Sequence, residues 1–327
     1  MRYILRRLGF FLVTLWAAMT VNFFLPRLMP GNPAMAMMAR FHGRLNGDSL
    51  HAMEVAFGVN SGESLIAQYF SYLGNSFTGQ FGRSLTFFPQ TVSHVVFSAL
   101  PWTLGLVGVT TIIAFILGTL IGMVGGWRRG GLFDSILPPL FIILSAFPYF
   151  WIGLLSILIF SISLGWLPTG FGYTNGTVAS LSWGFAWDVI RHAVLPAATI
   201  VVTSIGGWIL TMRNNMIMTL NEDYVRMARA KGVSSARIMF DYAGRNAILP
   251  NLSGFGMSLG LVVSGAILVE YVFSYPGVGY MMLQAVLNED FPLMQALFLF
   301  LTLAVLLAIL VVDGVTVLLD PRTRGRT

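Results

Sequence analysis

The sequence predicts an all-α membrane protein with about six transmembrane helices and with both chain termini in the cytoplasm. Hydrophobic residues make up 56% of the 327 residues and charged residues only 10%, with a mean hydropathy of +0.77. This is more apolar surface than a soluble core can bury. Six apolar runs are long enough to cross a bilayer, which takes about 20 helical residues. Most of the 19 Lys and Arg residues fall on one side of these runs.

The six runs are predicted to be helices, because a lone strand would leave its backbone groups without hydrogen bonds in lipid. We place them near residues 8–29, 99–126, 133–164, 193–215, 251–274 and 293–318. The third run contains Pro138, Pro139 and Pro148. We therefore expect it to be kinked, or to begin as an interfacial segment before it inserts. Five or seven helices are the alternatives to six.

The positive charges set the predicted orientation. They precede the first run, follow the second, occupy residues 213–245 and end the chain, at Arg2, Arg6, Arg7, Arg128, Arg129, Arg213, Arg226, Arg229, Lys231, Arg237, Arg245, Arg322, Arg324 and Arg326. The positive-inside rule makes this side cytoplasmic. The predicted parts are an N-terminal anchor helix at 1–29, an external loop subdomain at 30–98, a transmembrane core at 99–320 and a cytoplasmic tail at 321–327. The first run is too long for a signal-peptide core, so we expect it to stay uncleaved.

The external loop offers no catalytic or metal site. Residues 44–57 predict a short amphipathic helix, but the loop is too short to be a two-lobed solute-binding protein, so a solute captured at low concentration needs a separate receptor. The histidines in or beside this loop, His42, His51 and His94, lack metal-ligand spacing. The chain has no cysteine, which excludes thiolate metal sites and cysteine nucleophiles.

A polar, basic segment at residues 216–250 interrupts the apolar runs. Asn221 is expected to cap a helix with Glu222 and Asp223 in its first turn and with Arg229 and Lys231 in its last. Gly232 is expected to end this helix, and Ser234 or Ser235 to cap a second one that runs toward Ala247. Two apolar stripes suit a groove on a soluble partner; they consist of Tyr224, Val225, Met227 and Ala228, and of Ile238, Met239 and Tyr242. The alternative is an amphipathic segment lying on anionic lipid headgroups.

This segment resembles the cytoplasmic coupling loop of ABC importer permeases, most closely those of the dipeptide, oligopeptide and nickel family. The resemblance rests on Ala228, Gly232 and RNAILP at 245–250, and it continues in the same order with PGNP at 30–33, GWLPTGFGY at 165–173, FSYPGVGYMMLQAVLNEDFPLMQA at 273–296 and VVDGVTVLLDPRTR at 311–324. The general importer motif opens with Glu-Ala-Ala, whereas this chain has Arg226, Met227 and Ala228. Asp241 and Gly244 stand where the peptide branch usually carries a basic residue and a leucine.

The resemblance implies a transport subunit and not an enzyme. It implies that this chain forms half of the pathway for short peptides, with a second permease, two ATP-binding subunits and an external solute-binding protein as partners, in a bacterial or archaeal plasma membrane and without nucleic acid. It assigns the ATPase contact to Glu222, Asp223, Tyr224, Arg226, Met227, Ala228, Arg229, Lys231, Gly232, Arg237 and Arg245. Oligosaccharides and nickel chelates are alternative solutes.

ATP and magnesium are expected only in the partner subunits. The only lysine, Lys231, lies between Ala230 and Gly232 and therefore belongs to no phosphate-binding loop. The candidates for the substrate pathway or a gate are Pro148, Ser258, Ser264 and Glu270. An ion-coupled secondary carrier is the alternative of another class, and it would use acidic residues near the span ends, Asp134, Glu270 and Asp313. Gly118, Gly122 and Gly126 share one helix face, which favours close helix packing within the chain or against another subunit.

Overall fold

The computed structural model describes residues 2–28, 64–262 and 266–319. Over these ranges the chain is mostly helical, and the only pairing of extended backbone is an isolated antiparallel bridge between Arg83 and Thr91. The chain is therefore an all-α membrane protein, as predicted. The amphipathic helix expected at 44–57, His42, His51 and Ser264 lie outside the described residues. Contacts divide the chain into two compact units.

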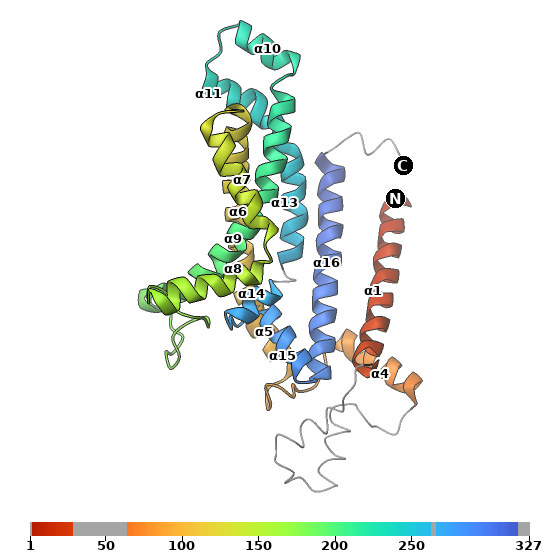
Figure 1. Ribbon diagram of the computed structural model, residues 1–327. Helices are drawn as coiled ribbons and strands as arrows, with labels where there is room; N and C mark the ends of the chain where they lie inside the picture. Colours follow the sequence, from red (N-terminus) through yellow and green to blue (C-terminus); the bar gives the residue numbers. More distant parts are fainter. Residues whose placement is uncertain (1, 29–63, 263–265, 320–327) are drawn as a thin grey trace. The chain divides into compact units, whose positions relative to one another are not determined.

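The first unit comprises residues 1–103, 263–267 and 276–327. Its helices are α1 (Arg2–Leu28), α4 (Leu65–Thr78), α5 (Val92–Thr103), α15 (Val278–Leu287) and α16 (Phe291–Leu319). Helix α1 runs beside α16, and the start of α1 and the end of α16 lie at the same end of this pair (Figure 1). Helix α5, helix α15 and the first turns of α16 share a buried apolar core that includes Val92, Val278 and Leu297.

Asp290, a fully buried carboxylate, lies between α15 and α16. Its Oδ2 accepts hydrogen bonds from the Ser84 hydroxyl at 2.5 Å and from the Thr86 backbone N–H at 2.8 Å, and its Oδ1 accepts one from the Leu293 N–H at 3.1 Å. Asp290 therefore caps the first turn of α16. It also holds the segment that precedes α5.

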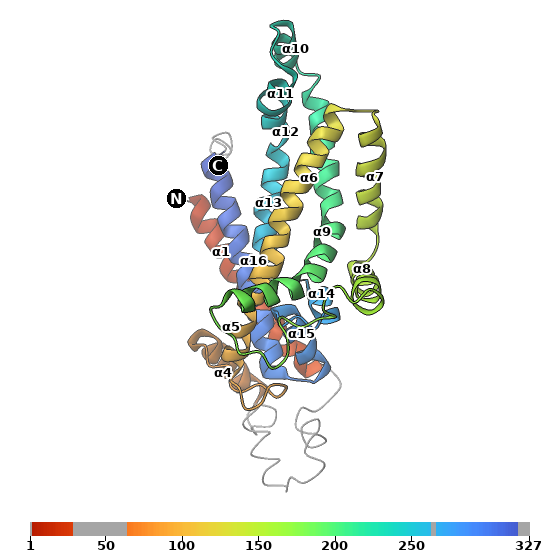
Figure 2. The ribbon, with the colours of Figure 1, turned by 90° about the vertical axis from the view of Figure 1, so that its left-hand side faces the viewer.

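The second unit comprises residues 104–262 and 268–275. Its elements include three π-helical segments, η1 (Leu104–Gly108), η2 (Ile157–Ser163) and η3 (Ile238–Gly244). Its α-helices are α6 (Val109–Trp127), α7 (Leu132–Ala146), α8 (Tyr149–Ser156), α9 (Trp183–Thr219), α10 (Asp223–Ala230), α11 (Ser235–Arg237), α12 (Arg245–Ala247), α13 (Leu249–Leu261) and most of α14 (Ile267–Val272). Helices α6, α7, α9 and α13 lie alongside one another (Figure 2).

Three glycines bring α6 against α9. A β-carbon on Gly118 would lie 2.5 Å from Cβ of Trp208, and one on Gly122 would lie 2.5 Å from the carbonyl oxygen of Ile209. Gly126 meets α9 at a similarly short distance. Small residues allow such an approach in lipid, where packing drives helix association. This glycine face therefore serves packing within the chain.

Four described helices are long and apolar enough to cross a membrane. They cover Arg7–Leu25 in α1, Val92–Trp127 through α5, η1 and α6, Trp183–Thr219 in α9, and Phe291–Leu310 in α16. They correspond to the first, second, fourth and sixth predicted runs. The bent pair formed by α7 with α8 and η2 brings the count to five at most.

The third run is bent, as predicted, and does not form one straight helix. Leu132–Ala146 and Tyr149–Ser163 meet at an angle of 99°. Phe147 adopts extended backbone dihedrals before Pro148, in keeping with the steric effect by which a proline ring disfavours the helical conformation of the residue that precedes it. The break therefore has a local cause in the sequence.

The fifth run differs from the expected continuous helix over 251–274. Leu249–Leu261 is a helix of 13 residues, which spans only about 20 Å. The short helix α14 follows beyond residues 263–265, which lie outside the description. In the described part of the chain, no single helix here reaches the length of a membrane crossing.

Candidate functional site

The polar segment forms a protrusion at the end of α9. We call residues 223–247 the α10–α12 protrusion; it contains α10, α11, η3 and α12. In both ribbon views α10 lies beyond the ends of α6, α7 and α13 (Figure 1, Figure 2). The protrusion is therefore the part of this unit that a soluble partner on that side meets first.

Helix α10 begins at Asp223, with Glu222 in the cap position. The prediction that Asn221 caps it is wrong. The Asn221 side chain donates from Nδ2 to the Ile217 carbonyl at 3.1 Å, because the last turn of α9 offers carbonyl groups that lack helical partners. Asp223 in the first turn and Arg229 in the last turn suit the helix dipole, as expected.

Gly232 ends α10, as predicted. Its φ is +72°, a left-handed conformation that an L-residue adopts only at a cost. The Gly232 N–H donates to the Arg229 carbonyl at 3.0 Å, and the Val233 N–H donates to the Ala228 carbonyl at 3.2 Å. These two bonds form a Schellman motif. A β-carbon on Gly232 would meet no atom within 4 Å, so the backbone and not crowding requires glycine here.

The apolar stripe of α10 divides between two faces. Val225 and Ala228 are buried, at 0% and 3% exposure. They belong to a core cluster within the chain whose other members come from α6, α9, η3 and α12, namely Met123, Met212, Met216, Ile238, Ala243 and Ala247. Tyr224 and Met227 remain exposed, at 39% and 59%. The expectation that the whole stripe faces a partner therefore needs correction, because Val225 and Ala228 seat α10 on its own unit.

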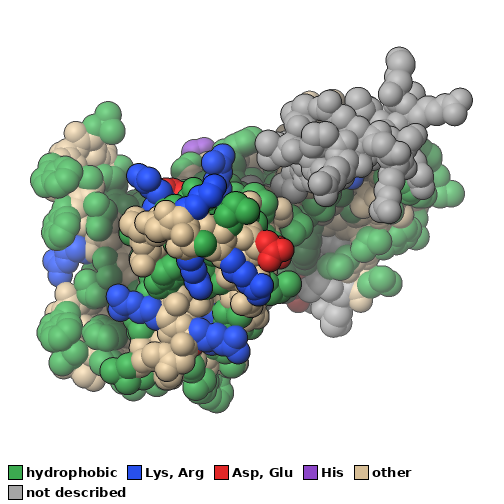
Figure 3. Space-filling model, turned by 90° about the horizontal axis from the view of Figure 1, so that it is seen from above, with side chains coloured by type: hydrophobic (Ala, Val, Ile, Leu, Met, Phe, Trp, Pro, Cys, Tyr) green, Lys and Arg blue, Asp and Glu red, His purple; other side chains and the backbone are tan. Residues whose placement is uncertain are grey.

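Exposed charges surround the outward face. The exposed basic side chains are Arg226, Arg229, Lys231, Arg237 and Arg245, and the exposed acidic ones are Glu222, Asp223 and Asp241. Seen from the end that carries α10, Lys and Arg side chains outnumber acidic ones on the visible surface (Figure 3). Arg226 lies 3.7 Å from Asp223, and the Arg229 guanidinium lies 5.8 Å from the centre of the Trp127 ring. The surface is thus basic, with Tyr224 and Met227 among the charges.

Two asparagines that the sequence did not single out by themselves join elements of this unit, and one of them lies in the protrusion. Asn246 donates from Nδ2 to the Tyr224 hydroxyl at 2.8 Å and so ties α12 to α10. Asn251, in α13, donates from Nδ2 to the Thr119 hydroxyl at 3.1 Å and to the Trp208 carbonyl at 3.2 Å. Asn246 is part of the RNAILP motif, so the motif held a signal for the first bond; we find no sequence signal for the second.

Asp134 does not have the environment of a proton carrier. Its two carboxylate oxygens accept from Nε and Nη2 of Arg213, and Oδ2 also accepts from the Gly130 N–H at 3.0 Å. Such a bidentate pair keeps the carboxylate charged and oriented. The structure therefore assigns Asp134 to the joint between α7 and α9. Asp313 lies in α16, and its side chain is outside the description.

The described pathway candidates come from separate elements. Pro148 lies at the break between α7 and α8, Ser258 lies in the last turn of α13, and Glu270 lies in α14 at 0% exposure. The Tyr275 N–H donates to the Glu270 carbonyl at 2.7 Å. Burial, and next the Glu270 carboxylate, raise the pKa of Tyr275 to about 12, so its phenol stays neutral at physiological pH.

The segment that follows α14 packs against the loop after η2. The Phe171 N–H donates to the Phe273 carbonyl at 2.8 Å. A β-carbon on Gly170 would lie 2.3 Å from that oxygen, so the close approach requires glycine at this position. Gly170 belongs to the GWLPTGFGY motif and Phe273 opens the FSYPGVG motif, so two motifs of the sequence meet here within one unit.

Comparison with known proteins identifies the family of this chain. Residues 114–325 match the family model described as "Binding-protein-dependent transport system inner membrane component". The chain is 35% identical over 338 residues to the di/tripeptide transport system permease protein DppB of Pseudomonas aeruginosa, which covers 98% of each chain. It is 31% identical to the oligopeptide transport system permease protein AppB of Bacillus subtilis, again over 98% of each. The dipeptide transport system permease protein DppB of Lactococcus lactis is 30% identical over 99% of each.

Proposed function

Because this chain belongs to the family of binding-protein-dependent transport system inner membrane components, among the dipeptide and oligopeptide permeases of ABC importers, we propose that it forms one half of the translocation pathway for short peptides. Permease subunits are transport components of the inner membrane and not enzymes. The names of the three relatives favour peptides over oligosaccharides or nickel chelates as the solute.

The proposed assembly contains partners of three kinds. A second, similar permease completes the pathway, two ATP-binding subunits bind and hydrolyse ATP with magnesium, and an external solute-binding protein delivers the peptide. Membership of a family named for dependence on a binding protein supports the last of these. In this assembly both termini and the α10–α12 protrusion face the cytoplasm, which the distribution of Lys and Arg supports.

The two-faced α10 is the observation that carries the proposed mechanism. Val225 and Ala228 bind it to the ends of α6 and α9, while Tyr224, Met227 and the basic side chains point outward. A helix held in this way transmits a push without melting, because its inner face is packed at 0% to 3% exposure. We propose that closure of the ATP-binding subunits moves the α10–α12 protrusion as one body and thereby changes which side of the membrane the pathway opens to.

Within this proposal the exposed residues touch the ATP-binding subunit and the buried ones position them. Tyr224, Met227, Arg226, Arg229 and Lys231 form the contact surface. Glu222, Asp223, Arg237 and Arg245 contribute charge at its rim, where charge sets the rate of association more than the affinity. Gly232 and Ala228 act through the shape and seating of α10.

For the candidate residues of the substrate pathway we propose the following roles. Pro148 shapes the turn between α7 and α8, and Ser258 supplies a hydroxyl group in the last turn of α13. Ser264 stays a candidate from the sequence alone. The complete burial of Glu270 supports a bracing role for this residue in preference to direct contact with the solute. Replacement of Glu270 by Gln with unchanged uptake would remove it from the pathway.

Uptake into proteoliposomes tests the proposed solute and energy source together. The full assembly, with its binding protein outside, is supplied with a di- to hexapeptide series, an oligosaccharide series and a nickel chelate, with ATP inside. We expect peptide uptake that needs ATP and that survives collapse of the proton gradient. Uptake that follows the gradient and ignores ATP would replace this proposal by the carrier.

A further inference from the structure

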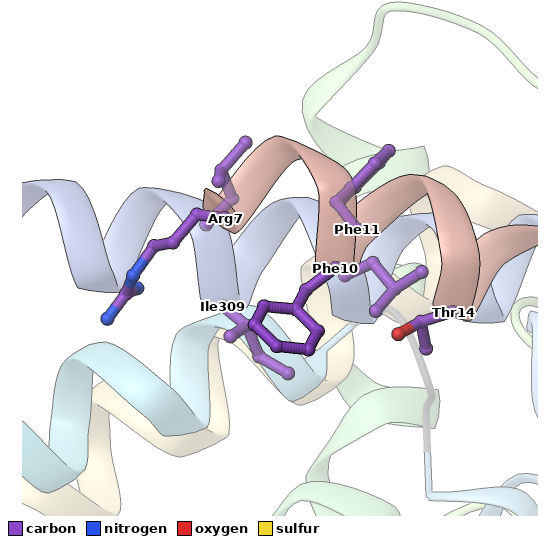
Figure 4. Close-up of a pocket in the computed structure, with 7 residues that line it drawn as sticks. Arg7, Phe10, Phe11, Thr14 and Ile309 are labelled. Carbon is purple, nitrogen blue, oxygen red and sulfur yellow. The ribbon is translucent and has the colours of Figure 1, made fainter. Parts of the chain in front are cut away.

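A pocket lies between α1 and α16 in the first unit. It has a volume of about 250 Å³ and is lined by one basic, one hydroxyl and five apolar side chains: Arg7, Phe10, Phe11, Thr14, Leu306, Ile309 and Leu310. Arg7 lies at one end of the group that α1 contributes and Thr14 at the other, with Phe10 and Ile309 between them (Figure 4). The pocket thus has a charged end and an apolar body.

The position of the pocket relative to the spans matches the edge of a bilayer. The long apolar run of α1 begins at Leu8, directly after Arg6 and Arg7. Arg7 lines the pocket at the start of this run, so the charged end of the pocket lies at headgroup level and its apolar body lies in the hydrocarbon. From Arg7 to Thr14 the pocket extends about 10 Å along α1, against roughly 15 Å for the hydrocarbon of one leaflet.

The chemistry of the lining selects the ligand. A guanidinium binds phosphate oxygens with two parallel hydrogen bonds. Exposed apolar side chains at Phe10 and Ile309, 61% and 52% exposed, gain nothing from a free phosphate ion but bind an acyl chain. Arg2 and Arg6 precede Arg7 in the sequence, and basic clusters beside a span attract anionic lipids of the cytoplasmic leaflet.

We propose that this pocket is a binding site for an anionic phospholipid, whose phosphate pairs with Arg7 and whose acyl chain packs on Phe10 and Ile309. The bound lipid fills the groove between the first turns of α1 and the facing part of α16. The site does not depend on the transported solute or on the ATP-binding subunits. Its test therefore stands apart from the test of the proposed function.

Lipid retention by the full chain tests the charged end. The protein is exchanged into nanodiscs of equal parts phosphatidylglycerol and phosphatidylcholine, extracted gently, and weighed by native mass spectrometry. We expect retained phosphatidylglycerol on the natural chain and a loss of at least about fivefold in Arg7→Gln, the factor that one basic residue at the membrane surface contributes. Arg7→Lys keeps the charge and should keep most of the lipid. Arg128→Gln removes an exposed arginine outside the pocket, in the loop that follows α6; it measures the loss that any surface arginine causes, and this loss should be smaller than that of Arg7→Gln.

A second variant tests the apolar body of the pocket. Ile309→Trp fills the pocket and should reduce retention of both lipids, whereas Ile112→Trp, at another exposed isoleucine of a span, should not. Equal retention by natural protein and Arg7→Gln would overturn the proposal. Displacement of the lipid by inorganic phosphate would assign the site to a soluble anion. If Arg7→Gln or Ile309→Trp changed association with the second permease and left lipid retention unchanged, the groove would belong to the subunit interface.

Discussion

Asp134 and Arg213 form a bidentate ion pair that fastens α7 to α9. Nε of Arg213 lies 2.5 Å from Oδ1 of Asp134, and Nη2 lies 2.8 Å from Oδ2. The Asp134 side chain is 5% exposed and that of Arg213 is 26% exposed. Because α9 leads directly into the α10–α12 protrusion, this pair holds the base from which α10 projects.

Removing both members of this pair should cost less than the sum of the two single removals. Asp134→Asn leaves the Arg213 charge in a partly buried site, and Arg213→Gln leaves the carboxylate there, so each should cost about 1 to 3 kcal/mol after allowance for the exposure of Arg213. In the double variant neither charge remains, and its loss should be smaller than the sum of the two. Thermal unfolding of the purified subunit measures all three, and strictly additive losses would count against a coupled pair.

Gly232→Val should uncouple ATP hydrolysis from uptake. A side chain at φ +72° costs about 1 to 2 kcal/mol and disfavours the Schellman end of α10. The protein should still insert, because the position is surrounded by open space. The measurement is the ratio of peptide transported to ATP hydrolysed in proteoliposomes. Gly184→Val, at a helical glycine with equally open surroundings, is the matched control; the same ratio in both variants would speak against the role of the turn.

The two faces of α10 should respond differently to truncation. Val225→Ala removes two methyl groups from a fully buried site and should lower stability by about 1 to 2 kcal/mol. Met227→Ala removes an exposed side chain and should change stability by less than about 0.5 kcal/mol, while it weakens co-purification of the ATP-binding subunit. Unfolding midpoints and pull-down yields separate the two effects. Full binding by Met227→Ala would move the contact away from this face.

A single methyl group on α6 should disturb its packing on α9. In Gly122→Ala the new β-carbon would lie 2.5 Å from the Ile209 carbonyl oxygen, so α6 and α9 must separate. Overpacking of this kind costs about 1 to 3 kcal/mol. Gly105→Ala has no atom within 4 Å of the new β-carbon and should be neutral. Thermal unfolding of the two variants side by side checks this, and equal stability would contradict the close contact.

Local signals in the sequence were sufficient to predict α10 and its end, because capping charges and a left-handed glycine are short-range features. The inward turn of Val225 and Ala228 was not predictable. A helix presents the same apolar periodicity whether its stripe packs on its own core or on a partner, so only the tertiary fold decides. Pro148 likewise predicted a break in the third run. The angle of 99° between its two helical parts was not predictable, because it depends on what α8 packs against.

Hydropathy predicted a longer uninterrupted helix than the structure contains. Residues 251–274 are mostly apolar, yet α13 ends at Leu261. Composition measures whether a segment tolerates lipid and does not show where its backbone turns. The role of Asp134 was open for a related reason, because its partner Arg213 lies 79 residues away and no local pattern links them.

The most direct test of ATP-driven peptide import is ATP hydrolysis by the assembled complex in lipid, with and without peptide-loaded binding protein. We expect loaded binding protein to stimulate hydrolysis, unloaded or oligosaccharide-exposed protein to do so only weakly, and Gly232→Val to remove the link between stimulation and uptake. Failure of this chain to associate with any ATP-binding subunit, together with transport driven by a proton gradient, would contradict the account.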